Sequence, residues 1–466
     1  MIIMKFGGTS IEDIDSVRRV VEIIHSRLDL CPVVVNSAMG KTTRKLLNIA
    51  RLSAEGMDKE AARELDAIRE YHVAMARGLT PDFKENNIRT ALERYFEELQ
   101  ELLEGLSVLR ELTPRSQDRI LSYGELVATT IIASALRQRG IDARWLDARA
   151  FIITDERFTG ARPVDDLTRL GIRRDVLPLV SSGCVPVIQG FIGSTRGGDT
   201  TTLGFEGSDL SASLVGAALD VSDIQIWKDV DGIMTADPSI FAGARTIKKI
   251  SFEEASELTF FGAKILHPDT LEPARSKDIP VHIYNSRQPE GGGTLITASA
   301  KSGSNVITSI AYKRSVCIVS IVPDARANPA GFFRAVFDVL DREGITPSVM
   351  TTSNAGMVMA VSASESSKCV TDELSRLGTV NIFGEKGTIS LVGENIRTAR
   401  GLASLVFRNL DGINIDMVAH GASPISFTFV VNETDIPSVI ARLHETFFKD
   451  PDPDLFGYPP PSLRKR

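Results

Sequence analysis

Apolar residues in this chain form short unbroken runs that alternate with amphipathic stretches. The run MIIMKF opens the sequence, and CPVVVNS and IQIWK are runs of the same kind. Such a run is typical of a strand that is buried on both faces of a parallel sheet. Between the first two runs, valine and isoleucine recur at helical spacing, which predicts a helix over residues 16–28. The alternation predicts an α/β sandwich with a mainly parallel sheet.

A long helical segment interrupts this alternation. Residues 48–112 are rich in Ala, Glu, Arg and Leu at helical spacing, which predicts a helical insertion or lid. An Ala-rich helix, SYGELVATTIIASALRQRG, follows and ends at Gly140, a common helix stop. Strand-like and helical stretches then alternate again, so we expect one domain over residues 1–296.

The second half of the chain contains a repeat. Beyond a predicted linker of Ala, Ser, Gly and Lys near residues 297–306, AVFDVLDREGI resembles LVFRNLDGINI, which follows 70 residues later. Each copy lies between two apolar strands, which predicts two ferredoxin-like α+β modules over 307–378 and 379–449, whose strands can interleave. The Pro-rich, polar residues 450–466 predict a disordered tail.

Composition excludes several function classes. The net charge of -7 is mild and both signs are interspersed, so there is no sign of nucleic-acid binding. Four cysteines and six histidines are scattered without C-x-x-C, which favours reduced thiols over disulfides or a protein-held metal. Neither a signal peptide nor a membrane-spanning stretch is evident. We therefore expect a soluble, cytoplasmic protein.

The stretch VVVNSAMGKTTRKLL resembles the end of a phosphate-binding P-loop. The P-loop pattern G-x-x-x-x-G-K-[ST] needs a glycine at position 35, where this chain has Val35. A β-branched residue resists the left-handed backbone that wraps a loop around a phosphate. The stretch therefore predicts a strand, a polar loop and a helix near a small anion, but not a P-loop.

Two glycine loops carry candidate site residues. MKFGGTS places Lys5 at the end of a buried strand, and the N–H groups of Gly7 and Gly8 can bind an anion beside its positive charge. A tight turn with a surface lysine explains the same residues. TTLGFEGSDLSASL places Ser208 and Asp209 at the start of an apolar helix. There Asp209 either fixes a cation or only caps the helix.

Two further segments follow the ends of apolar stretches. IQIWKDVDGIMTADP runs from a strand into Lys228 and Asp229, and FFGAKILHP carries Lys264. Ligands of open parallel sheets gather beyond the carboxyl ends of strands. An ordinary turn and a solvated lysine explain these residues equally well.

In their order along the chain, these stretches resemble the aspartate kinases of the amino acid kinase family. The collinear motifs are KFGGTS, NSAMGKTT, SYGELVAT, QGFIGS, TTLGxxGSD, WKDVDG with TADP, and FGAKILHP, over about the first 295 residues. The repeated modules resemble the tandem ACT domains of these enzymes, which are small amino-acid-binding modules. The resemblance implies transfer of the γ-phosphoryl group of ATP, with Mg²⁺, to the side-chain carboxylate of L-aspartate. This reaction is the first step towards lysine, threonine and methionine.

The resemblance also implies roles for the candidate residues. Lys5 and Asp209 are the catalytic pair, in which Asp209 orients the lysine. The substrate side comprises Ser37, Thr43, Glu125, Phe191 and Ser208, of which Glu125 receives the substrate ammonium. The nucleotide side comprises Gly7, Gly8, Lys228, Asp229 and Lys264. No general base is required, because a carboxylate with a pKa of about 4 is already ionised at neutral pH.

One departure from the family pattern affects the substrate side. The glycine loop of the family usually reads LGRGGSD, and its Arg binds a substrate carboxylate, whereas this chain has Phe205 and Glu206. We expect another cation to replace the lost bidentate partner. Arg157 and Arg162, in the segment RFTGARP, carry spare positive charge in the region before this loop.

The first ACT-like module lacks the acids of lysine-inhibited aspartokinases. In GITPSVMTTSNAG, Ser348 and Asn354 stand at the matching places. They can bind the α-groups of a neutral amino acid, but they offer no counter-charge to a lysine side chain. The sequence therefore predicts weak or absent inhibition by lysine, with threonine or another uncharged amino acid as the better effector. The alternative is that the two ACT-like modules are structural and bind no amino acid.

Three functions are compatible with these residues. The first is an active aspartate kinase with a rearranged carboxylate site, which forms a homodimer through its ACT modules. The second is a non-catalytic regulatory subunit of an aspartokinase. The third is a kinase for another acidic amino acid, such as glutamate or N-acetylglutamate. Because Lys5, Glu125 and Asp209 are all retained, the sequence favours the first.

Overall fold

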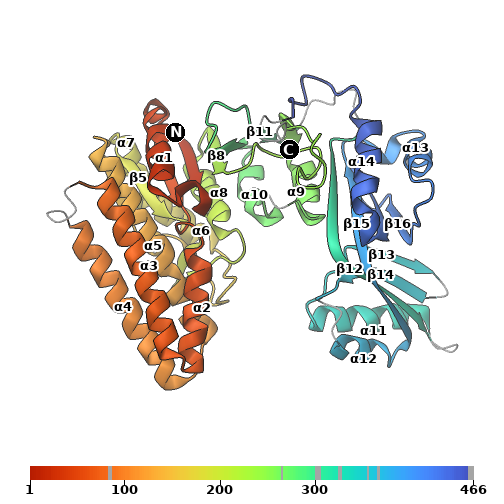
Figure 1. Cartoon of the computed structure of the whole chain (residues 1–466), viewed down its shortest axis with the longest axis horizontal. Coiled ribbons are helices and arrows are strands. Elements are labelled where there is room, and N and C mark those ends of the chain that lie inside the picture. Colours follow the sequence, from red (N-terminus) through yellow and green to blue (C-terminus); the bar gives the residue numbers. More distant parts are fainter. Residues whose placement is uncertain are drawn as a thin grey trace. The chain divides into compact units, whose positions relative to one another are not determined.

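The computed structural model describes residues 1–81, 87–263, 266–299, 306–323, 328–353, 356–364 and 368–459. The chain forms two compact units (Figure 1). The first comprises Met1–Gly232 and Asp269–Ala298, and the second comprises Ile233–Pro268 and Ser299–Arg466. The sequence predicts one catalytic domain up to residue 296, whereas residues 233–268 pack with the second unit.

A sheet of mainly parallel strands forms the centre of the first unit. Its strands are, in order, β3 (Ala143–Leu146), β5 (Val185–Gln189), β2 (Pro32–Asn36), β1 (Ile2–Phe6), β8 (Asp223–Lys228), β10 (Val281–Asn285) and β11 (Thr294–Thr297). Only the β10–β11 pairing among these is antiparallel. Every residue of β1, β2 and β5 is buried, as expected for strands covered on both faces. The predicted α/β sandwich is confirmed.

The helices of the first unit differ widely in length. They are α1 (Ile14–His25), α2 (Thr42–Glu55), α3 (Asp58–Leu79), α4 (Ile88–Leu109), α5 (Pro114–Gln138), α6 (Asp165–Asp175), α7 (Leu177–Ser181), α8 (Gly207–Leu219) and α10 (Pro268–Arg275). The predicted helical insertion is α2 to α4, which pack on one another and on α5 (Figure 1). Helix α5 is long and apolar enough to cross a membrane, but 89% of its most apolar stretch is buried inside the protein. It is therefore a core helix.

A small second sheet leads into the glycine loop at residues 203–207. It contains β4 (Ile153–Thr154), β6 (Ile192–Thr195) and β7 (Thr200–Thr202). Asp118 of α5 holds this sheet, because its carboxylate accepts hydrogen bonds from the backbone N–H groups of Thr159 and Thr202 and from the Thr202 hydroxyl. The core helix thus anchors the strand directly before the loop.

The second unit contains one antiparallel sheet shared by two α+β modules. Its strands are, in order, β13 (Val349–Ser353), β14 (Gly356–Ser362), β12 (Ser309–Pro323), β15 (Gly378–Val392), β17 (Ser426–Asn432) and β16 (Met417–His420). Further elements are β9 (Lys249–Ser251), α9 (Phe252–Phe260), α11 (Pro329–Arg342), α12 (Lys368–Leu374), α13 (Leu402–Asn409) and α14 (Ile436–Phe447). The 15-residue strands β12 and β15 pair along almost their whole length, so both pass through the two modules. The modules therefore interleave.

The predicted disordered tail does not hold for residues 450–459. Phe456 is buried, and its ring lies 5.4 Å from that of Phe448. Backbone hydrogen bonds join Leu455 to Lys248 and Gly457 to Thr246. The composition of the tail is polar on average, but burial of one aromatic side chain and these backbone pairs orders the segment. Residues 460–466 lie outside the described residues.

Candidate active site

Four charged side chains of alternating sign meet where β1 and β8 end. The Lys5 Nζ atom lies 2.5 Å from Oδ1 of Asp209, and the Lys228 Nζ atom lies 3.0 Å from Oδ2 of the same carboxylate. Glu206 adds a second acid, with Oε1 3.6 Å from the Lys228 Nζ atom. We call these four residues the charged array. It brings together three predicted site residues, although more than 200 positions of the sequence separate Lys5 from Asp209 and Lys228.

Burial and pairing set the protonation states of the array. Burial lowers the pKa of Lys5, although Asp209 favours the ammonium. Burial also disfavours the ammonium of Lys228, but Asp209 and Glu206 outweigh it and raise the pKa of Lys228. For Asp209, burial favours the neutral acid, but Lys228 and Lys5 together hold its pKa below the ordinary value. Asp209 therefore stays ionised between two ammonium groups.

The position of Asp209 follows from the start of α8. Asp209 lies in the first turn of this helix, where the helix dipole stabilises a carboxylate. Gly207 begins the helix in close contact with its surroundings, because a Cβ there would lie 2.9 Å from the Leu203 Cβ and 3.0 Å from the Phe191 ring. A larger residue at 207 would push the first turn, and Asp209 with it, away from Lys5.

The glycines of KFGGTS have different tasks. The Gly7 N–H donates to the carbonyl of Trp227 at 3.1 Å, so this N–H is already engaged within the protein, and its binding of the phosphoryl group stays a prediction. Gly7 can still line the site, because a Cβ there would lie 3.8 Å from the Lys5 Nζ atom. At Gly8 a Cβ would lie 2.6 Å from the carbonyl of Ala38 and 2.7 Å from that of Gly40. Gly8 therefore permits close approach of the β2–α2 loop.

The β2–α2 loop is not a P-loop. Helix α2 begins at Thr42, whose hydroxyl donates to the carbonyl of Met39 at 2.7 Å. The side chain of Lys41 is exposed. The Gly40 N–H donates to the carbonyl of Gly8. The Thr42 hydroxyl and the Gly40 N–H, with which a P-loop would hold a phosphate, are thus engaged within the protein. This agrees with the prediction that the loop is not a P-loop.

Glu125 of α5 lies with two other predicted substrate residues. Its buried carboxylate accepts hydrogen bonds from the Ala38 N–H and from the Thr43 side chain. Ser37 lies directly before Ala38 and donates its N–H to the carbonyl of Phe6. Burial raises the pKa of Glu125 to about 8. Its Oε2 atom has no hydrogen-bond partner in the described part of the chain, so it can accept a donor from a ligand.

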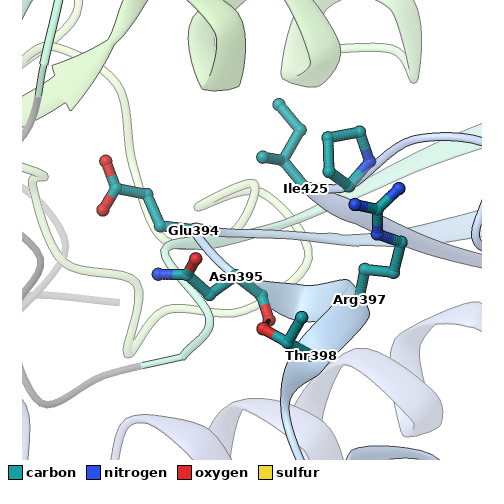
Figure 2. A pocket seen from close by; sticks show the side chains of 6 residues that line it. Glu394, Asn395, Arg397, Thr398 and Ile425 are labelled. Atoms are coloured by element: carbon teal, nitrogen blue, oxygen red, sulfur yellow. Dashed lines mark hydrogen bonds between the residues drawn. The ribbon is translucent and has the colours of Figure 1, made fainter.

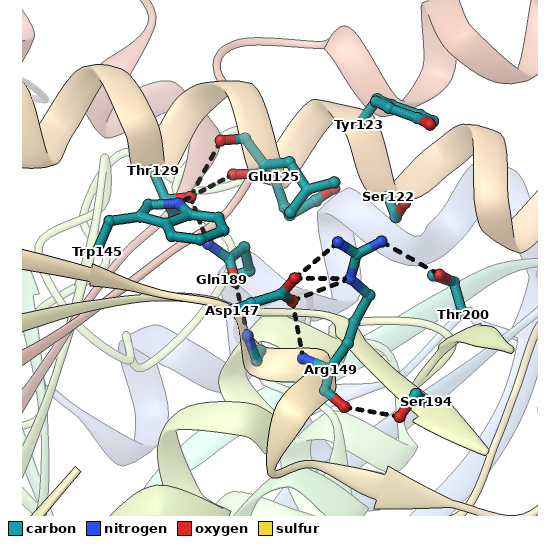
Figure 3. Close-up of polar contacts among 12 residues, drawn as sticks. Ser122, Tyr123, Glu125, Thr129, Trp145, Asp147, Arg149, Gln189, Ser194 and Thr200 are labelled. Atoms are coloured by element: carbon teal, nitrogen blue, oxygen red, sulfur yellow. Dashed lines mark hydrogen bonds and ion pairs between the residues drawn. The ribbon is translucent and has the colours of Figure 1, made fainter. Parts of the chain in front are cut away.

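A polar network fixes the helical turn that carries Glu125 (Figure 3). The Thr129 hydroxyl donates to the Glu125 carbonyl at 2.8 Å and accepts from Trp145 Nε1 and Gln189 Nε2. The Gln189 side chain also accepts from the Ala148 N–H at 2.8 Å. These bonds join α5 to the ends of β3 and β5. The sequence offers no local signal for them, because their members come from three separate elements.

Phe191 and Ser208 lie where β5 meets α8. Phe191 has a left-handed backbone with φ 70°, and its N–H donates to the hydroxyl of Ser211. A Cβ on the neighbouring Gly190 would lie 2.6 Å from the Cβ of Ser208. The two predicted substrate residues are thus close together in the structure.

The arginines expected to replace the missing family Arg are exposed. Arg162 lies on the loop beside the glycine loop, since its neighbour Ala161 donates its N–H to the carbonyl of Thr202. Arg157 pairs with Asp155 at 3.6 Å. Phe205 itself is 80% exposed. Arg162 thus lies on a loop beside the glycine loop, and its role in place of the family Arg stays a prediction.

The remaining predicted residues lie outside these clusters. Asp229 directly follows the array and is exposed. In the second unit, the N–H and hydroxyl of Ser348 both donate to the carbonyl of Ala360, at 2.8 and 3.1 Å. Its hydroxyl can therefore accept a hydrogen bond from a ligand but has already used its proton. Lys264 and Asn354 lie outside the described residues.

The second unit also contains a surface pocket of about 210 Å³ (Figure 2). It lies where β15 ends and β17 begins, and it is lined by Glu394, Asn395, Arg397, Thr398, Pro424 and Ile425. Burial, and then the negative charge of Glu254, raise the pKa of Glu394. Sequence reasoning did not identify this pocket.

Comparison with known proteins covers almost the whole chain. Residues 1–285 match the amino acid kinase family, and residues 389–447 match the ACT domain. Aspartokinase 1, chloroplastic, of Arabidopsis thaliana is 34% identical over 466 residues, which cover 97% of this chain and 80% of that protein. The crystal structure of E. coli aspartokinase III in complex with aspartate and ADP (R-state) is 33% identical, with a TM-score of 0.84 over 96% of this chain and 100% of that one. The complex of the same enzyme with lysine and aspartate (T-state) has a TM-score of 0.81, with 33% identity, over 96% of this chain and 99% of that one.

Proposed function

The chain belongs to the amino acid kinase family and, within it, to the aspartokinases, and from this premise we propose which role each site residue has in the reaction. As an aspartokinase it transfers the γ-phosphoryl group of ATP to the side-chain carboxylate of L-aspartate, giving 4-phospho-L-aspartate. The accepting carboxylate is ionised at neutral pH and attacks without a general base. The remaining task is to align two anions that repel each other and to offset their charge.

The charged array supplies this positive charge. Lys5 faces the transferred phosphoryl group, where its ammonium stabilises the charge that develops in the transition state. Lys228 supports the nucleotide phosphates from the end of β8. Asp209 binds both ammonium groups, so it orients Lys5 and keeps the two lysines from moving apart. Because the array is buried, these charges act with little screening by water.

Glu125 receives the ammonium of the substrate. Its Oε2 atom is buried without a partner in the described residues, and an ammonium group supplies both the hydrogen bond and the counter-charge. Ser37 of the β2–α2 loop, Thr43 of the first turn of α2, and Phe191 and Ser208 between β5 and α8 contact the rest of the substrate. Arg162 on the neighbouring loop replaces the family Arg as the partner of a substrate carboxylate.

We expect Mg²⁺ to be held mainly by the nucleotide in this site. Both carboxylate oxygens of Asp209 are occupied by lysine ammonium groups, which leaves them poor ligands for a metal. The phosphate oxygens of ATP are suitable ligands for Mg²⁺, and the bound ion offsets part of their charge. Asp229 completes the nucleotide side, with Gly7 and Gly8 near Lys5, while Lys264, which lies outside the described residues, stays a prediction for this side.

The ACT modules provide regulation and assembly. One of the solved relatives, E. coli aspartokinase III, was crystallised in complex with lysine and aspartate. For this chain we infer an uncharged amino acid such as threonine, because Ser348 and Asn354 carry no charge opposite a lysine side chain. The resemblance to tandem ACT modules also leads us to expect a homodimer formed through the second unit. We infer that the reaction takes place in the cytoplasm, in keeping with cysteines that are scattered along the sequence without a C-x-x-C pattern.

The buried pairing of Lys5, Asp209 and Lys228, together with a Glu125 oxygen that has no partner among the described residues, carries this proposal. A decayed regulatory subunit would have no reason to keep buried charges whose desolvation is costly. The test is an ADP-release assay with MgATP and, in turn, L-aspartate, L-glutamate and N-acetyl-L-glutamate. We expect turnover with aspartate. Background rates with aspartate in a folded preparation would refute the function, and turnover with either alternative instead would reassign the substrate.

A further inference from the structure

Glu206 has a backbone conformation that is unfavourable for its residue type. Its φ and ψ angles are 53° and 25°, in the left-handed region. A residue with a side chain gives up roughly 1 kcal/mol there relative to glycine, and the family pattern LGRGGSD has glycine at this position. The side chain does not cap α8 with a hydrogen bond, so capping does not offset the cost. The strain indicates that the carboxylate itself has a use.

The carboxylate of Glu206 points at Lys228 within the charged array. Its Oε1 atom lies 3.6 Å from the Lys228 Nζ atom, and its side chain is 16% exposed. Its Oε2 atom is buried and has no hydrogen-bond partner among the described residues. Without Glu206, the single carboxylate of Asp209 would have to balance two ammonium groups in a buried site.

We propose that Glu206 is a positioning residue for phosphoryl transfer, which acts as the second counter-ion of Lys228 and holds its charged ammonium beside Asp209 and Lys5. This inference rests on the proposed aspartate kinase function. With two acids for two lysines, neither ammonium needs to lose its proton to relieve repulsion. Lys228 then stays at the end of β8, where it can meet a phosphate oxygen.

The charged surroundings of Lys228 support this assignment. Among the described residues, Asp209 and Glu206 face it from the α8 segment, and Lys5 faces it from β1. On the other side, β10 contributes the neutral Asn285, which is bonded to Asp231 at 2.6 Å. Asp209 and then Glu206 raise the pKa of Lys228 against the effect of burial. Glu206 also favours the ammonium of Lys5.

Two variants separate charge from strain. Glu206→Gln removes the charge and keeps the size, whereas Glu206→Gly removes the charge and also the left-handed strain. In both, we expect the basic limb of the pH profile of kcat/KM to move down by about one pH unit, the usual size of the effect of one nearby charge. Only Glu206→Gly should also raise the midpoint of thermal unfolding. A purely structural role predicts no shift of the basic limb in Glu206→Gln.

A second measurement needs no turnover. Trace acetylation with acetic anhydride over a range of pH, read by mass spectrometry and normalised to the exposed Lys41, reports how readily Lys228 loses its proton. Glu206→Gln should move the Lys228 labelling curve to lower pH by about one unit. Glu22→Gln is the matched control, since it removes a carboxylate from an exposed ion pair with Arg139 and should leave the curve in place.

The two readouts keep the hypotheses apart. An unchanged Lys228 curve in Glu206→Gln would overturn the role of Glu206, whether or not the enzyme is active. If the wild-type protein has no kinase activity but the Lys228 labelling curve still shifts in Glu206→Gln, the kinase function is refuted. The pairing of Glu206 with Lys228 is then supported.

Discussion

Lys5 of β1 and Asp209 of α8 form a buried ion pair, with the Nζ atom 2.5 Å from Oδ1 and side chains only 6% and 1% exposed. Such a pair is costly to desolvate and would contribute little to stability compared with well-packed apolar residues. Its position at the edge of the sheet where ligands of parallel sheets bind explains why it is kept.

Replacement of Lys5 tests its catalytic role. We expect Lys5→Ala to lower kcat by on the order of a hundredfold or more, the typical effect of losing a preorganised charge in the transition state. Lys41→Ala is the control, because Lys41 is exposed and only resembles a P-loop lysine. Steady-state kinetics with varied ATP and aspartate decides the matter. An unchanged kcat with only a raised KM for ATP would make Lys5 a binding residue.

The raised pKa of Glu125 predicts proton release on substrate binding. Burial raises this pKa to about 8, so at pH 7 the carboxyl group of the free protein is protonated. An arriving ammonium group favours the carboxylate, and the proton leaves. Affinity for aspartate should therefore fall as the pH drops below 8, by up to about tenfold per unit. Isothermal titration at pH 7 in buffers of different ionisation enthalpy should show release of close to one proton.

The same group affects stability with the opposite trend. Between its ordinary pKa of 4.5 and its folded-state pKa of about 8, the folded chain binds a proton that the unfolded chain does not. Stability therefore falls as the pH rises through this window. Glu125→Gln should bind aspartate weakly, release no proton, and unfold at a higher temperature than the wild type at pH 8. An equal or lower midpoint would show that the carboxylate is not desolvated as described.

The Arg162 side chain is the proposed partner of a substrate carboxylate. We expect Arg162→Ala to raise KM for aspartate about tenfold, with a much smaller change in KM for ATP, since a charged hydrogen bond contributes about 1.5 kcal/mol or more. Arg157→Ala serves as the comparison, because Arg157 already pairs with Asp155. If neither variant alters KM for aspartate, another group must hold the substrate carboxylates.

The effector should be an uncharged amino acid. The Ser348 hydroxyl donates to Ala360, so its lone pairs can accept a hydrogen bond from an ammonium group but supply no negative charge opposite a lysine side chain. Isothermal titration of the full-length protein with threonine and with lysine compares the two. We expect tighter binding of threonine and a loss of at least threefold in Ser348→Ala. Micromolar binding of lysine that depends on Ser348 would contradict this.

His444 should make the second unit sensitive to acid. Burial lowers its pKa to about 4, and its Nε2 atom lies 2.8 Å from the Thr235 hydroxyl. That hydroxyl accepts a hydrogen bond from the Arg245 N–H, so it donates to the neutral imidazole. The unfolded chain takes up a proton below pH 6.5 and the folded chain does not until about pH 4, so stability falls as the pH drops through this window.

Thermal unfolding between pH 7 and 4 measures the effect. The loss attributable to His444 should be on the order of 2 kcal/mol, and His444→Gln should show a flatter pH dependence. His25→Gln is the control, since His25 is exposed at the end of α1. Parallel curves for wild type and His444→Gln would exclude a contribution from this histidine.

Local patterns in the sequence predict much of this protein. The runs MIIMKF and CPVVVNS form β1 and β2, because burial on both faces of a strand requires consecutive apolar residues. The 70-residue repeat forms two modules. Helix ends are less well predicted. Helix α1 begins at Ile14 and not at residue 16, since Asp13 accepts a hydrogen bond from the Ser16 N–H and caps the helix earlier.

By itself, the sequence determined the α/β class, the repeated modules and the family, and it predicts Lys5, Glu125 and Asp209 as site residues. Only the tertiary structure decided which groups surround these residues. It occupies the Gly7 N–H with Trp227, leaves one Glu125 oxygen without a partner in the described chain, orders residues 450–459, and adds Glu206 to the charged array. The physical reason is that hydrophobic periodicity is a property of neighbouring residues, whereas desolvation and ion pairing depend on side chains from separate elements, and their distances exist only after the chain has folded.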